Sequence, residues 1–96
     1  MTLDELRAGH RARIMDLAAN RGASNIRVFG SVARDTSTST SDIDLVVDFE
    51  PGRSLLDLTG LQLDLQVELG CKVDVISSRG LKPRMAAEIE RDAVPL

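Results

Sequence analysis

The spacing of apolar residues along the 96-residue chain predicts helices and short strands in alternation. A capping box of Thr2 and Glu5 opens an apolar repeat of helical period, and Gly22 stands where a glycine commonly ends a helix. The predicted helices are Leu3–Arg21, Leu55–Leu69 and Pro83–Arg91, and the predicted strands are Ile26–Phe29, Ile43–Phe49 and Val73–Ile76. This order predicts an α/β (α+β) domain in which helices pack on a small sheet.

The second long helix carries two apolar stripes instead of one. The stripes consist of Leu58, Leu61, Leu65 and Leu69 and of Leu56, Leu63 and Val67. One stripe is enough to cover a sheet, so the second indicates either deep burial or contact with another protein chain. Because so small a domain has few elements to cover both stripes, we favour a protein interface.

Aspartates occupy positions where strands usually carry other residues. Asp42 and Asp44 share one face at the start of the second strand, and Asp74 stands between two valines of the third. If both strands belong to one sheet, the three carboxylates converge, repel one another and raise one another's pKa. A divalent cation such as Mg²⁺ or Mn²⁺ removes that repulsion and suits in-line phosphoryl or nucleotidyl transfer.

A glycine-serine pair at the end of the first strand supplies the features of a phosphate site. Gly30 allows backbone N–H groups to approach phosphate oxygens, and Ser31 begins the following segment. Arg34 could donate two parallel hydrogen bonds to a phosphate. The alternative is that Gly30-Ser31 is an ordinary turn and that the aspartates merely cap strand ends. The combination of the pair, the arginine and the third acidic strand favours the phosphate and metal site.

Composition narrows the classes of function. The net charge of −3 and the scarcity of aromatic residues, two phenylalanines in all, argue against direct binding of nucleic acid. A single cysteine, Cys71, suits a reducing compartment, and no apolar run is long enough for a signal peptide or a membrane span. We therefore expect residues 1–96 to form a single cytoplasmic domain with no membrane partner.

Three segments together resemble a known superfamily. They read G-S-V-A-R, then S-D-I-D-L-V-V, then K-V-D-V-I, and a later L-K-P-R also fits. Over essentially its whole length the chain resembles the DNA polymerase β-type nucleotidyltransferases, and more narrowly the minimal nucleotidyltransferases, the MNT-domain antitoxins paired with HEPN-domain toxins. The resemblance implies a palm-like fold with a mixed sheet, binding of ATP and Mg²⁺ (or Mn²⁺), and transfer of AMP to a tyrosine of the toxin.

The resemblance also assigns roles to individual residues. Asp42 and Asp44 match the paired metal ligands, and Asp74 matches the third carboxylate, which could also accept the proton of the attacking hydroxyl. The phosphate-binding turn corresponds to Gly30 and Ser31, with Arg34 following. One departure is Asp35, where family members usually have glycine. Its carboxylate could weaken triphosphate binding by repulsion or point to solvent, and we favour solvent.

Three hypotheses about function follow. The first is a Mg²⁺-dependent protein adenylyltransferase, whose tyrosine acceptor must come from a partner because this chain contains no tyrosine. The second is an antitoxin that neutralises its toxin by contact alone. The third is nucleotidyl transfer to a small molecule, for which related enzymes generally carry an additional domain. A homodimer or a hetero-oligomer with the toxin is compatible with each of the first two.

Overall fold

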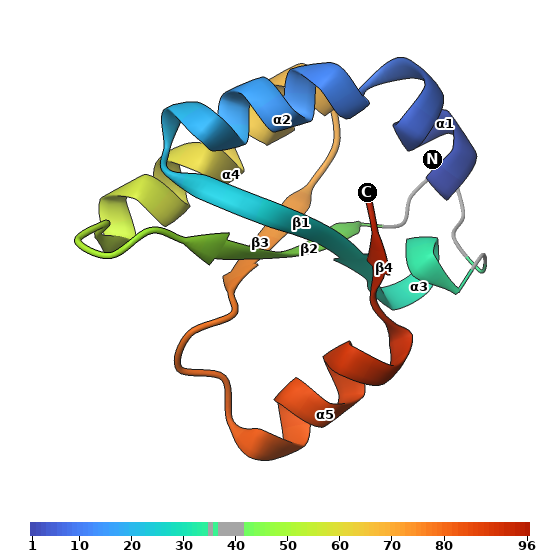
Figure 1. The fold of residues 1–96 in the computed structure, drawn as a ribbon. Coiled ribbons are helices and arrows are strands. Elements are labelled where there is room, and N and C mark those ends of the chain that lie inside the picture. The colour runs from blue at the N-terminus through green and yellow to red at the C-terminus, as the bar shows by residue number, and fades with distance from the viewer. Residues whose placement is uncertain (35, 37–41) are drawn as a thin grey trace.

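The computed structural model describes residues 1–34, 36 and 42–96 as a mixed sheet with helices on both faces (Figure 1). The helices are α1 (Leu3–Gly9), α2 (Arg11–Asn20), α3 (Gly30–Ala33), α4 (Leu55–Leu69) and α5 (Pro83–Asp92). The strands are β1 (Ala23–Phe29), β2 (Ile43–Phe49), β3 (Val73–Ser77) and β4 (Val94–Pro95). They lie in the order β3-β2-β1-β4, with β2 and β3 parallel and the other neighbours antiparallel. The predicted α/β (α+β) class is confirmed.

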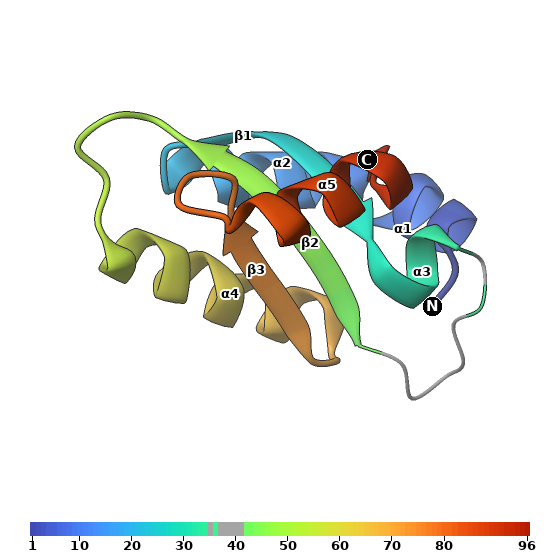
Figure 2. The same ribbon diagram turned by 90° about the horizontal axis from the view of Figure 1, so that it is seen from below.

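The two faces of the sheet have different coverings. Helices α1, α2 and α4 lie on one face, while α5 crosses the other and leaves β3 open (Figures 1 and 2). Residues of β2 alternate accordingly, since Ile43, Leu45 and Val47 are buried toward the three helices and Asp44 and Asp48 are partly exposed on the α5 face. The fold therefore gives the sheet one apolar face and one face on which acidic groups can remain solvated.

The N-terminal helix differs from its prediction. The predicted Leu3–Arg21 helix is divided into α1 and α2 at His10, whose φ of −132° and ψ of −9° are not helical. Hydrogen bonds nevertheless continue across the break, from His10 N to Leu6 O and from Ile14 N to His10 O. Because Leu6 and Ile14 are both fully buried, the apolar repeat continues through a change of direction that the period alone does not reveal.

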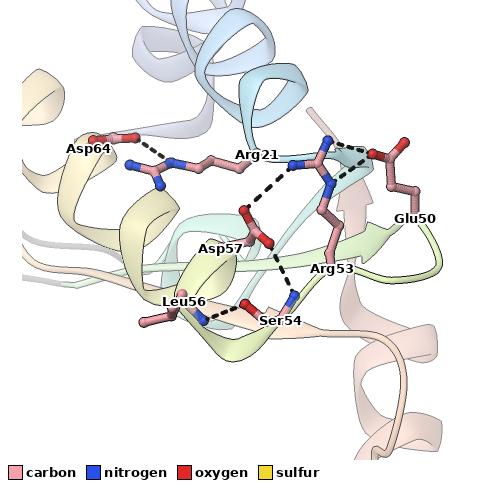
Figure 3. A network of polar contacts seen from close by, with 7 residues as sticks. All are labelled: Arg21, Glu50, Arg53, Ser54, Leu56, Asp57 and Asp64. Carbon is pink, nitrogen blue, oxygen red and sulfur yellow. Dashed lines mark hydrogen bonds and ion pairs between the residues drawn. The ribbon is translucent and has the colours of Figure 1, made fainter.

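Local signals fix both ends of α4. Ser54 accepts a hydrogen bond at its Oγ from Leu56 N (3.2 Å), and Asp57 Oδ2 accepts one from Ser54 N (3.1 Å), which forms a capping box (Figure 3). At the other end Gly70 adopts the left-handed conformation with φ of 67°. These signals explain why the predicted range Leu55–Leu69 agrees with the structure at both ends.

The two stripes of α4 have different surroundings. Leu61, Leu65 and Leu69 of the first stripe are buried in the core, whereas the second stripe is exposed to solvent. The alternative of deep burial for the second stripe is therefore wrong. The protein interface stays a prediction. None of the helices in the described part of the chain is long and apolar enough to cross a membrane.

Candidate active site

Parallel pairing of β2 and β3 brings two of the predicted carboxylates together. Asp44 and Asp74 are partners in the register of the two strands, and both are partly exposed on the α5 face. Asp42 directly precedes β2 and lies close enough to act electrostatically on Asp44. The structure thus places all three predicted aspartates in one region, at the end of the sheet that α3 also occupies (Figure 2).

The charge balance around Asp44 is unfavourable for three free carboxylates. Burial raises the pKa of Asp44, and the neighbouring charges of Asp74 and then Asp42 raise it further. A hydrogen bond between the Asp44 and Asp74 side chains acts in the same direction, while the positive charge of Arg34 opposes it. Such a pair of carboxylates is stabilised by a shared proton or by a cation between them.

Gly30 lies directly against the Asp44 carboxylate. It adopts a φ of +75°, and a Cβ added there would overlap with Asp44 Oδ2. The backbone conformation therefore favours glycine at this position, and any side chain there would have to displace the Asp44 carboxylate. Its neighbour Phe29 pairs with Asp44 in the antiparallel register of β1 and β2, which fixes the Gly30-Ser31 turn beside the carboxylates.

Arg34 follows the single turn of α3 and reaches α5. Its side-chain Nη1 lies 3.9 Å from Asp92 Oδ2, and its backbone N–H donates a hydrogen bond to the backbone oxygen of Gly30 (3.2 Å). A cavity of about 230 Å³ opens between α3 and α5. Its lining consists of Phe29, Gly30, Arg34, Met85, Glu88, Ile89 and Asp92. The α5 side of this cavity did not emerge from the sequence, because its residues carry no motif and lie about 50 positions from Arg34 in the chain.

The three aspartates offer oxygen ligands of the kind that a divalent cation prefers. Asp42 Oδ2 lies 3.6 Å from Lys72 Nζ, with the two side chains 42% and 64% exposed. Within residues 1–34, 36 and 42–96, no three carboxylate, imidazole or thiol groups are already arranged as a metal site. Asp44 and Asp74 nevertheless fit a hard cation by donor type and by their mutual repulsion, and an exposed ion pair such as Lys72–Asp42 is worth only about 0–1 kcal/mol. Asp42 can therefore exchange Lys72 for a cation at small cost.

The family follows from comparison with known proteins. A family model described as a nucleotidyltransferase domain matches residues 16–95. The chain belongs to the nucleotidyltransferase family. Protein adenylyltransferase MntA of Thermococcus cleftensis is 35% identical to this nucleotidyltransferase over 94 residues, which cover 98% of this chain and 95% of that protein. The resemblance read from the three sequence segments is therefore confirmed.

Solved structures share the fold. A protein provisionally described as a minimal nucleotidyltransferase superimposes with a TM-score of 0.86 at 49% identity, covering 100% of this chain and 97% of that one. A toxin–antitoxin complex with AMP-PNP superimposes with a TM-score of 0.79 at 20% identity, covering 90% of this chain and 71% of that one. A complex of the tri-AMPylated Shewanella oneidensis HEPN toxin with its MNT antitoxin superimposes with a TM-score of 0.68 at 19% identity. The match covers 88% of this chain and 66% of that one. The last two likenesses concern the fold alone.

Two other aspartates of this nucleotidyltransferase, Asp35 and Asp48, stand close to the site in the sequence. Asp35, the departure from the family pattern, lies outside the described residues. Asp48, further along the Asp44 face, accepts hydrogen bonds from Asn25 Nδ2 (2.9 Å) and Arg27 Nη2 (2.6 Å). A hydrogen bond from Ser78, followed by those from Asn25 and Arg27, lowers the pKa of Asp48. Asp48 therefore holds the β1–β2 pair together and lies apart from the acidic pair.

Proposed function

We propose that this nucleotidyltransferase transfers AMP from ATP to a tyrosine hydroxyl of a HEPN toxin and so neutralises the toxin. The observation that carries the proposal is the Asp44–Asp74 pair directly beside the Gly30 turn. The names of similar proteins support it, since MntA of Thermococcus cleftensis is a protein adenylyltransferase and one neighbouring structure contains an AMPylated HEPN toxin with its MNT antitoxin.

Each residue of the site has a role in this reaction. Gly30, Ser31 and Arg34 would hold the triphosphate, and Asp42, Asp44 and Asp74 would hold Mg²⁺ or Mn²⁺. When bound, the cation supplies positive charge against the phosphates. The tyrosine oxygen forms a bond to the α-phosphorus, the bond from that phosphorus to the bridging oxygen breaks, and pyrophosphate leaves with the electron pair. Asp74 would accept the hydroxyl proton.

The acceptor has to come from another molecule. The chain contains no tyrosine, and the acidic pair consists of one residue of β2 and one of β3, the strand that α5 leaves uncovered on this face (Figure 2). A partner that presents its hydroxyl to Asp74 must therefore approach from that face. We also propose that residues 1–96 act as one domain in the cytoplasm, where ATP is abundant and Cys71 remains a thiol.

The test is an intact-mass measurement on the partner toxin. We expect the toxin to gain one or more AMP groups on incubation with this chain, ATP and Mg²⁺ or Mn²⁺, and none when ATP is omitted. The contact-only antitoxin is favoured by Asp35, an acidic residue at the position where family members usually have glycine. It becomes the better account if the toxin is neutralised, its tyrosine is accessible and its mass does not change.

A further inference from the structure

The outer face of α4 is the most exposed apolar surface of the described residues. We define it by the second stripe of the helix, Leu56, Leu63 and Val67, whose side chains are 80%, 55% and 85% exposed. They belong to one helix of 15 residues, which is about 22 Å long. An apolar face that continues along a whole helix is typical of an interaction site and differs from singly scattered hydrophobic residues.

Although α5 leaves the face of β3 uncovered, the hydrogen-bonding edge of β3 is not available to an added strand. β3 is the edge strand, and its Val73 N–H and Val75 N–H donate hydrogen bonds to the side-chain oxygens of Gln66 (3.3 Å) and Gln62 (3.0 Å) on α4. Two donors that an added strand would need are therefore already engaged. A partner at this place has to cover α4 by side-chain packing, which is what another helix does.

The acidic residues of α4 are paired within the chain. The distance is 3.6 Å between Arg53 Nη1 and Asp57 Oδ1 and 3.1 Å between Arg21 Nε and Asp64 Oδ2. The third pair joins Arg13 Nε to Glu68 Oε2 at 3.5 Å. Figure 3 shows the first two pairs, with the arginines reaching toward α4 from the side of α2 and the β2–α4 loop. Two copies related by a two-fold axis place the same charges near each other, so an internally neutralised helix favours pairing with itself.

The position of α4 relative to the active site selects the occupant. α4 covers the face of the sheet opposite Asp44 and Asp74, whereas an acceptor of AMP must approach from the α5 face (Figure 1). This step rests on the proposed function. We infer that the outer face of α4 pairs with the same face of a second copy of this chain, as antiparallel helices in a homodimer whose two active sites face away from each other.

Sedimentation velocity on the purified chain tests the pairing. One helix pair buries less than the roughly 800 Å² per partner of a standard interface, so we expect a dissociation constant of micromolar order. The mass of the wild-type chain should rise from 10.4 kDa toward twice that value between about 1 and 300 μM. Leu63→Glu and Val67→Glu should weaken the dimer at least tenfold and keep wild-type circular dichroism, because both side chains are mostly exposed.

Met85→Glu is the matched control for these variants. It places the same charge at the other exposed large hydrophobic residue of the described chain, on α5, and should dimerise as the wild type does. A wild-type chain that remains monomeric at the highest concentration overturns the inference. So does equal weakening by all three glutamate variants. The measurement contains no ATP, so a failure of AMP transfer would not change its outcome.

Cross-linking shows whether the partner is a second copy. In a chain with Cys71→Ser, Leu63→Cys lies near the middle of the outer face and should form a disulfide-linked dimer under mild oxidation, whereas Ala87→Cys on α5 should not. Absence of the Leu63→Cys dimer contradicts the pairing. If the wild type is monomeric and Leu63→Glu instead abolishes co-purification with a HEPN toxin, the outer face belongs to that toxin.

Discussion

At the scale of single residues, the site depends on one position without a side chain. Gly30 combines a left-handed φ of +75° with an approach to Asp44 Oδ2 so close that an added Cβ would displace the carboxylate. The position was predicted from the sequence as a phosphate-binding glycine, but its closeness to Asp44 was not, because that contact depends on the pairing of Phe29 with Asp44. The same residue thus serves the backbone turn and the acidic pair.

Gly30→Ala should therefore cause two separable losses. The left-handed conformation costs a residue with a Cβ about 1–2 kcal/mol of stability, and the added methyl group must displace the Asp44 carboxylate. Gly80→Ala is the matched control, since Gly80 has the same φ of +75° and nothing within 4 Å of an added Cβ. Both variants should melt at a lower temperature, and Gly30→Ala alone should lose the stabilisation by Mg²⁺ and ATP. Equal stabilisation of the two variants by Mg²⁺ and ATP contradicts this reasoning.

Asp48 gives a second prediction at this scale, on pH. Its pKa is lowered in the folded chain by the hydrogen bonds from Ser78 and Asn25 and by Arg27, so the ionised form stabilises the fold above the unfolded pKa, near 3.8. That contribution is lost as the pH falls through the lowered value. Because the side chain is 42% exposed, we expect ionised Asp48 to contribute less than about 1 kcal/mol to the free energy of unfolding. Urea unfolding should show Asp48→Asn less stable than the wild type at pH 7, and the difference should shrink as the pH falls from 3.8 through the lowered pKa. A difference that persists in acid would exclude a charge effect.

At the scale of elements, sequence patterns predicted α4 and β2 at both ends but not the break at His10 or the strand β4. Capping groups and turn residues act locally, so they can be read from neighbouring residues. β4 contains only Val94 and Pro95 and exists because Arg27 and Val28 of β1 pair with it. Such a strand depends on a contact across almost 70 positions of the chain, which no local pattern contains. The cavity between α3 and α5 was missed for the same reason.

Ser54→Ala tests the local origin of α4. Loss of the Oγ acceptor for Leu56 N should cost about 1 kcal/mol, which corresponds to a melting temperature lower by about 4–8 °C in a domain of this size. Thr59→Ala on the same helix is the control and should change stability by no more than a few tenths of a kcal/mol, because alanine is a good helix former. If the two variants melt alike, the capping box does not determine where α4 begins.

At the scale of the whole molecule, the sheet separates two surfaces. The acidic pair and Gly30 lie toward α5, and the exposed leucines of α4 lie on the other side (Figure 1). Sequence alternation predicted the aspartates on one face, and helical period predicted two stripes on α4. Which stripe stays exposed was set by packing, since Leu61 and Leu65 fill the core against the buried face of the sheet. Chemistry and self-association can therefore be altered independently.

Asp44→Asn tests this independence. The substitution nearly preserves the shape of the side chain but removes a charge that would hold the cation, and loss of such a group should lower the rate of AMP transfer at least ~10²-fold. The variant should be no less stable than the wild type at pH 7, because burial and the charges of Asp74 and Asp42 raise the pKa of Asp44 and make its ionised form unfavourable. It should still co-purify with its toxin and add no AMP to it.

Lys72→Met, which frees Asp42 from its ion pair, should retain transfer and serves as the control for a change of charge near the site. If Asp44→Asn transfers AMP at the wild-type rate by intact-mass analysis, the acidic pair is not the active site, and the reaction would have to use another part of the molecule.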